Sequence, residues 1–166
     1  MKNLTEHLSQ YARYHRDERN ILTHYAGIPL IVVAVFALLY WPLFTLAGMV
    51  ITPALLLFIG SMAFYLRLDL RFGLVMFVFS GISLLLAAKL AALPFGLWLG
   101  SAIALFVVGW VLQFIGHYYE GKKPAFVDDL IGLLIGPLFI MAELGFKLGL
   151  RKPLQHRIEQ IAGKTH

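Results

Sequence analysis

Four uninterrupted apolar runs, each near the length that crosses a lipid bilayer, constrain this chain more than any other feature. They cover residues 26–48, 50–66, 72–88 and 95–116. A helix needs roughly 20 apolar residues to cross a hydrocarbon core of about 30 Å. Since 60% of the 166 residues are hydrophobic and only 14% are charged, we predict an all-α polytopic membrane helix bundle with four spans.

The composition also excludes several kinds of site. The chain has no cysteine, which rules out disulfides, iron–sulfur clusters and thiolate nucleophiles, and leaves His, Asp, Glu, Asn and Gln as metal ligands. The net charge of +5 comes from basic residues scattered between the apolar runs, so we predict no nucleic-acid partner. Phosphate-binding loops, dinucleotide fingerprints and serine nucleophile elbows are absent.

The segments that flank the four runs are more polar. Residues 1–25 form a cytoplasmic segment in which apolar residues at helical spacing over 4–19 predict an interfacial helix. Residues 125–150 are apolar but contain Asp128, Asp129 and Glu143 and the pair Gly136 and Pro137. Charges and proline are costly inside a bilayer, so we predict a broken pair of helices, re-entrant or interfacial. Residues 151–166 then form a cytoplasmic tail, and residues 1–166 a single membrane domain.

Basic residues indicate the orientation. With four spans, every Lys and Arg except Lys89 lies on one side of the membrane. The positive-inside rule assigns that side, and both termini, to the cytoplasm. We predict an integral membrane protein of the bacterial inner membrane, or of the endoplasmic reticulum in a eukaryote, with membrane lipid as a partner and homo-oligomerisation left open.

Three histidines stand at membrane boundaries on the predicted cytoplasmic side: His15, His24 and His117. Gln113 and Glu120 share one helical face with His117, and Asn20 shares a face with His24. His15 and His24, nine residues apart, would point in opposite directions on one continuous helix. A shared metal site therefore requires a break in the helix near residues 17–19.

Simpler interpretations of these residues remain open. Each histidine can be an interfacial side chain or a helix cap. Asp128 and Asp129 can complement the N-terminus of the following helix, and Glu120 can pair with Lys122 or Lys123. The residues alone therefore indicate a small polytopic protein with a candidate His/carboxylate metal site at its cytoplasmic face.

Two blocks of the sequence resemble a known family. The first contains Tyr14, His15, Asn20, His24, Pro29 and Leu30, and the second contains Gly109, Trp110, Gln113, Phe114, Gly116, His117, Glu120, Gly121, Lys122, Lys123, Pro124 and Ala125. Their spacing is similar to that of the Fe(II)-dependent 2-hydroxy fatty acid dioxygenases, whose best-known member is a yeast endoplasmic-reticulum enzyme. With the apolar runs between the blocks, the resemblance extends over nearly the whole chain.

The resemblance implies α-oxidation, in which a 2-hydroxy fatty acid and O₂ yield CO₂, water and a fatty acid one carbon shorter. The substrate supplies all four electrons, so no second reductant is required. The family's histidines correspond to His15, His24 and His117, which we expect to bind Fe(II). Glu120 is then a further catalytic residue, and substrate-binding or supporting roles fall to Asn20, Gln113, Lys122, Lys123 and Asp128. Arg19 is another candidate for holding the substrate carboxylate.

Two other functions remain open from the sequence. One is a metal-dependent lipid hydrolase that uses a metal-activated water with Glu120 or Asp128 as general base. The other is a non-enzymatic metal-binding membrane scaffold.

Overall fold

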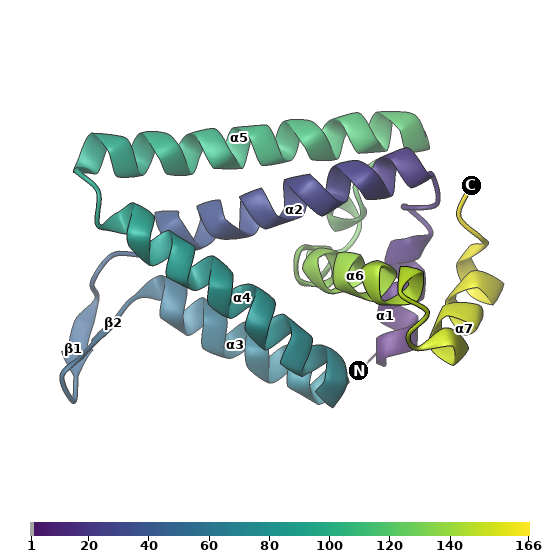
Figure 1. Cartoon of the computed structure of the whole chain (residues 1–166), viewed down its shortest axis with the longest axis horizontal. Helices are drawn as coiled ribbons and strands as arrows, with labels where there is room; N and C mark the ends of the chain where they lie inside the picture. Colours follow the sequence, from purple (N-terminus) through teal and green to yellow (C-terminus); the bar gives the residue numbers. More distant parts are fainter. Residues whose placement is uncertain (1) are drawn as a thin grey trace. The chain divides into compact units, whose positions relative to one another are not determined.

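The computed structural model describes residues 2–166, which are mainly helical (Figure 1). Two short strands, β1 (Phe44–Leu46) and β2 (Met49–Ile51), and one 3₁₀ turn, Ala125–Val127, accompany the α-helices. The helices within this range are α1 (Leu4–Ala12), α2 (Glu18–Leu38), α3 (Pro53–Leu68), α4 (Leu70–Ala91), α5 (Phe95–Glu120), α6 (Gly132–Lys147) and α7 (Lys152–Ala162).

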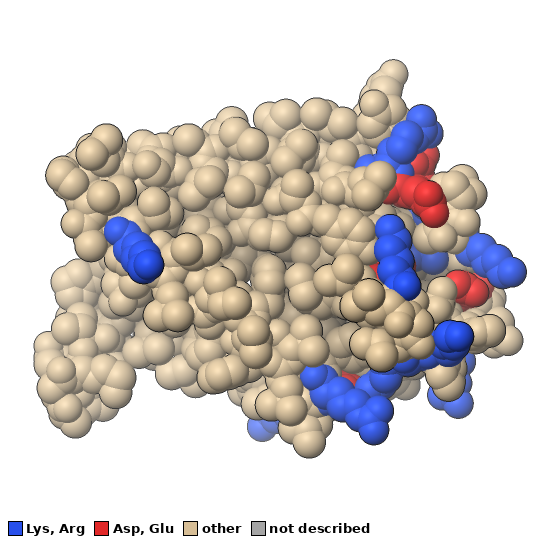
Figure 2. Space-filling view, in the orientation of Figure 1, with Lys and Arg blue, Asp and Glu red and all other residues tan. Residues whose placement is uncertain are grey.

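Three of these helices, α2, α4 and α5, are long and apolar enough to cross a membrane. Large apolar side chains are exposed along α4 and α5, and Figure 2 shows large areas of the surface without charged groups, with most of the Lys, Arg, Asp and Glu drawn toward its right-hand side. A lipid-facing surface has this character. The helical class and the membrane character predicted from the sequence are therefore confirmed. The fourth predicted span, 50–66, corresponds to α3, which has 16 residues, so the count of four spans stays a prediction.

The first apolar run does not form one helix. α2 begins at Glu18 and ends at Leu38, and residues 44–51 form an antiparallel hairpin instead. The prediction that the span reaches residue 48 is therefore wrong. Pro42 cannot continue a helix, and Ala47 and Gly48, both with positive φ, make the tight turn that joins two strands of right-handed twist.

The predicted break at Gly136 and Pro137 is also wrong, because α6 runs through both residues. A proline costs one hydrogen bond, but residues 135–140 are all buried, so packing holds the helix together. The break lies at residues 148–151, where Gly149 and Arg151 adopt left-handed conformations. α6 and α7 meet there at 117°, so much of the predicted tail is the helix α7.

The chain divides into two compact units. One comprises Pro29–Trp110, with α3 packed against α4 and a small core that includes Phe36, Ala54 and Ala102. The other is formed by the chain up to Ile28 and by Val111–His166. In this second unit α1 packs against α6 and α7, and every histidine of the candidate site belongs to it.

Candidate metal centre

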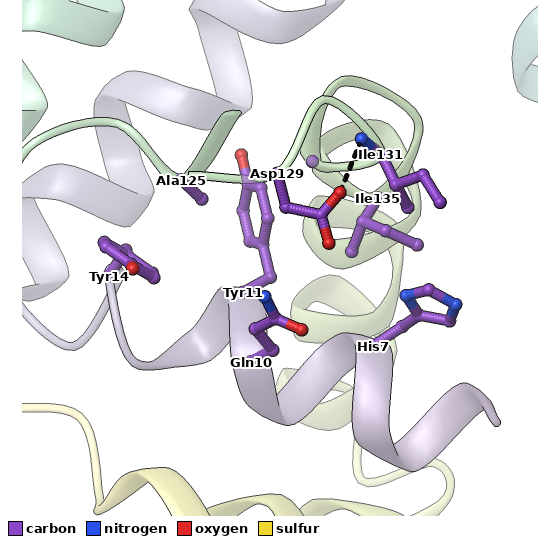
Figure 3. Close-up of a pocket in the computed structure, with 9 residues that line it drawn as sticks. His7, Gln10, Tyr11, Tyr14, Ala125, Asp129, Ile131 and Ile135 are labelled. Atoms are coloured by element: carbon purple, nitrogen blue, oxygen red, sulfur yellow. Dashed lines mark hydrogen bonds between the residues drawn. The ribbon is translucent and has the colours of Figure 1, made fainter. Parts of the chain in front are cut away.

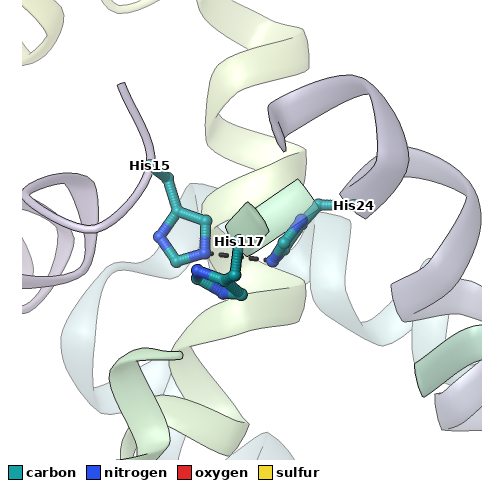
Figure 4. A group of neighbouring side chains, drawn as sticks. All are labelled: His15, His24 and His117. Carbon is teal, nitrogen blue, oxygen red and sulfur yellow. Dashed lines mark hydrogen bonds between the residues drawn. The ribbon is translucent and has the colours of Figure 1, made fainter. Parts of the chain in front are cut away.

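Three segments of the second unit bring His15, His24 and His117 together (Figure 4). His15 lies in the irregular segment 13–17 between α1 and α2, His24 lies on the second turn of α2, and His117 lies near the end of α5. One ring nitrogen from each residue lies within 4.8 Å of those of the other two. The exposed fractions are 0%, 1% and 6%, so the cluster is buried. The helix break that a shared site requires is confirmed.

Backbone carbonyls determine how two of these rings are protonated. Nδ1 of His15 lies 2.8 Å from the carbonyl oxygen of Tyr11, and Nδ1 of His24 lies 2.8 Å from that of Asn20. A carbonyl only accepts, so each Nδ1 carries the hydrogen, and each neutral ring has its lone pair on Nε2. Metal-binding histidines are commonly oriented by such a bond from the other ring nitrogen.

The two Nε2 atoms of His15 and His24 face each other at 3.0 Å. Two lone pairs at this distance repel unless a cation lies between them. Burial, aided by the neighbouring His24, holds the pKa of His15 well below its usual value near 6.5, which disfavours a proton in this place. Two metal–nitrogen bonds of about 2.1 Å that meet at 90–110° separate their nitrogens by about 3.0–3.4 Å. The donor set therefore fits a transition metal.

Glu120 shapes the segment that carries His15. Its carboxylate accepts hydrogen bonds from the backbone N–H groups of Arg16, at 2.9 Å, and Asp17, at 2.8 Å, and from the side-chain amide of Asn20, at 3.1 Å. These donors precede or open α2, where N–H groups lack partners within the helix. Glu120 thus anchors the turn between α1 and α2, and neither Lys122 nor Lys123 pairs with it.

Two predicted polar residues lie close to the histidines along their helices. Gln113 precedes His117 by one turn of α5, and Asn20 precedes His24 by one turn of α2. Both side chains are buried, and Nε2 of Gln113 and Oδ1 of Asn20 have no hydrogen-bond partner among the described residues. A buried polar atom without a partner is costly, and Oδ1 of Asn20 lies against Gly116, where an added Cβ would collide with it.

The other predicted polar residues contact the chain itself. Lys122 donates from Nζ to the carbonyl oxygen of Arg13 at 2.7 Å. Asp128 forms an ion pair with Lys123 and accepts a hydrogen bond from Tyr14. These contacts connect the segment after α5 to the turn that carries His15.

Arg19 also has partners of its own. Its guanidinium pairs with Asp17 at 2.7 Å and lies over the ring of Tyr119. The side chain is thus held by the start of α2 and the end of α5.

Sequence reasoning missed the ion pair between Arg16 and Glu143. Arg16, next to His15, is buried and pairs with Glu143 of α6 at 3.2 Å. Glu143 interrupts an apolar stretch, and a charge in such a place indicates a buried partner. The sequence contained that signal, but it did not show which basic residue pairs with Glu143.

Tyr11 was missed as well. Its ring stacks on that of His15 at 4.2 Å between centroids, with an interplanar angle of 3°. Tyr11 also lines a small surface pocket with His7, Gln10 and Asp129 (Figure 3). The pocket offers about 20 Å³, enough for about one water molecule and too little for an acyl chain.

A helical protein with membrane-length apolar helices and a buried cluster of three histidines is an integral membrane protein with a candidate metal site. Comparison with known proteins makes the class specific. The chain belongs to the family described as 2-hydroxy-palmitic acid dioxygenase Mpo1-like, whose family model matches residues 1–148. The dioxygenase family expected from the two sequence blocks is therefore confirmed.

One relative shows how far the similarity extends. The chain is 33% identical over 165 residues to the 2-hydroxy-palmitic acid dioxygenase MPO1 of Saccharomyces cerevisiae, and the match covers 95% of this chain and 90% of the yeast protein. No solved structure matches. At the level of the family, the chain is an oxidoreductase of fatty-acid metabolism.

Proposed function

We propose that this protein is an Fe(II)-dependent dioxygenase that shortens 2-hydroxy fatty acids by one carbon. The observation that carries the proposal is the pair of Nε2 atoms of His15 and His24, which face each other at 3.0 Å in a buried site beside His117. The yeast relative named for 2-hydroxy-palmitic acid supports the substrate class.

The proposed reaction converts R–CH(OH)–COOH and O₂ into R–COOH, CO₂ and H₂O. Three neutral imidazoles leave coordination positions open, a ligand set that suits Fe(II) in oxygen chemistry. When bound, the iron would supply the site at which O₂ and the hydroxy acid are activated. No external reductant is needed because the substrate gives up all four electrons.

The chain's own groups would orient the site and the substrate. The bonds from Nδ1 to the carbonyls of Tyr11 and Asn20 fix the rings of His15 and His24. The unpartnered amide nitrogen of Gln113 can donate to the substrate carboxylate. A buried polar atom would thereby gain a partner that it otherwise lacks.

The contacts of the carboxylates argue against a hydrolase. A general base needs an oxygen that is free to take a proton from water. The Glu120 oxygens already accept hydrogen bonds from three donors, and Asp128 is engaged by Lys123 and Tyr14.

The test is metal analysis of the detergent-purified protein, followed by anaerobic loading with Fe(II) and an assay of O₂ uptake with 2-hydroxypalmitate. We expect about one iron per chain and a product one carbon shorter. His15→Ala, His24→Ala and His117→Ala should each abolish turnover, whereas His156→Ala, an exposed change on α7, should not. Zinc without O₂ uptake, or turnover retained in any two of the three variants, would refute the proposal.

We also propose that both termini lie in the cytoplasm, because four spans would place all Lys and Arg except Lys89 on that side. A reporter fused to the carboxyl terminus should be active only in the cytoplasm. Activity on the opposite side of the membrane would require an odd number of spans.

A further inference from the structure

Arg16 is a buried arginine that directly follows a proposed metal ligand, His15. Its side chain is 5% exposed, and its donors reach three parts of the fold. Nε donates to the carbonyl oxygens of Ala12 and His15, each at 2.8 Å. Nη1 donates to the carbonyl oxygen of Gly163 at 3.0 Å, and Nη2 to Oε1 of Glu143 at 3.2 Å.

The backbone of Arg16 is held as firmly as its side chain. Its N–H donates to Glu120, at the end of α5. Its carbonyl accepts from the N–H of His166 at 2.9 Å, and a main-chain oxygen of His166 in turn accepts from the N–H of Glu18 at 3.0 Å. Segments from both ends of the chain and from α5 and α6 therefore converge on one residue.

These contacts serve either the stability of the fold alone or, in addition, the position of the metal site. A buried guanidinium is costly unless every donor is paired, and a chain of this size could close its core with an apolar residue here. The arrangement instead fixes the carbonyl oxygen of His15 itself, and with it the backbone from which the imidazole projects. Glu143 and Gly163 supply no ligand to the cluster, yet both determine where that backbone lies.

We propose that Arg16 is a positioning residue for the metal centre: it clamps the segment of His15 against α6 and the C-terminal segment, so that Nε2 of His15 is held opposite Nε2 of His24. The proposal rests on the proposed function, because it assumes that the three histidines bind a metal. Groups that hydrogen-bond a metal-binding side chain typically change metal affinity 10- to 100-fold when they are removed, and we expect Arg16, which holds the backbone of His15, to act at the lower end of that range.

Arginine suits this task better than lysine. Its planar group presents five donors in fixed directions, whereas an ammonium group is a single point on a flexible stem. The bonds from Arg16 run to three carbonyl oxygens and one carboxylate oxygen. Lysine keeps the charge that pairs with Glu143 but cannot serve all four acceptors.

The experiment compares Arg16→Lys with Arg13→Lys. Arg13 lies on the other side of His15 in the same turn, and its side chain is exposed, so the control makes the same chemical change nearby. Co(II), a spectroscopic substitute for Fe(II), is titrated into each purified full-length protein, and thermal unfolding is measured without metal. We expect the Co(II) Kd of Arg16→Lys to rise at least tenfold, with an altered absorption spectrum at saturation, and that of Arg13→Lys to stay within twofold.

Two results would overturn this inference without overturning the proposed function. One is a Kd of Arg16→Lys within twofold of the unmodified protein; a loss of thermal stability alongside it would show that Arg16 is merely structural. The second result applies if Arg16→Lys does not fold and Glu143→Gln, which keeps an oxygen acceptor, replaces it. We expect the Co(II) Kd of Glu143→Gln to rise at least threefold, and an unchanged Kd would refute the inference. An unmodified protein that binds no metal would instead refute the proposed function, and this inference with it.

Discussion

Replacing Glu120 tests whether the turn that carries His15 is held as the structure shows. Glu120→Ala removes the acceptor of three donors: the N–H groups of Arg16 and Asp17 and the amide of Asn20. A buried donor without a partner costs about 1–3 kcal/mol. Glu120 is only partly buried, so water reaches part of the gap and the lower value applies to each donor.

We therefore expect Glu120→Ala to lose about 3 kcal/mol of unfolding free energy. Glu120→Gln, which keeps one acceptor oxygen, should lose about half of that. Metal affinity should fall in the same order, because Glu120 anchors the segment of His15 without being one of the three clustered residues.

The assay is unfolding in detergent followed by circular dichroism, with a parallel Co(II) titration. Glu18→Ala is the matched control, since Glu18 is an exposed glutamate on the first turn of α2. Its loss should cost only the interaction with the helix dipole, about 0.3–1 kcal/mol. Equal stability and equal metal affinity in Glu120→Ala and Glu18→Ala would refute the anchoring role.

Two further predictions follow from local packing and charge. A Cβ at Gly116 would collide with Asn20, so Gly116→Ala should lower the unfolding free energy by about 1–3 kcal/mol and weaken metal binding. Gly100→Ala is the control, because its added methyl meets nothing within 4 Å, and it should do neither. Equal effects of the two substitutions would refute the close contact of α2 and α5 at Gly116. The hydrogen bond from Lys123, and to a lesser extent that from Tyr14, holds the pKa of Asp128 below its usual value near 3.8. This carboxylate therefore stabilises the fold above pH 3.8, and its contribution is lost as the pH falls through the depressed pKa. Asp128→Asn should accordingly flatten the acid side of the pH–stability curve, and an unchanged curve would contradict the assignment.

Much of this protein follows from local sequence. Apolar runs over 72–88 and 95–116 lie within the helices α4 and α5, because a long apolar run that must satisfy its own backbone groups in lipid has few alternatives to a helix. The spacing of His15 and His24 required a break between them, and the break is present. The two sequence blocks identified the family. Locally, however, an apolar run does not reveal where a helix ends, as the hairpin after Leu38 shows.

Only the tertiary structure decided what the polar residues do. Glu120 lies 104 residues from Arg16 along the chain, and Glu143 lies 127 residues from it, so no periodicity could pair them. The orientation of the two facing Nε2 atoms depends on carbonyl oxygens that each ring meets only once the turn between α1 and α2 has formed. The residue types indicated a candidate metal site, whereas long-range contacts determine its geometry. Hydrogen bonds act over about 3 Å in space regardless of the separation of the residues in sequence.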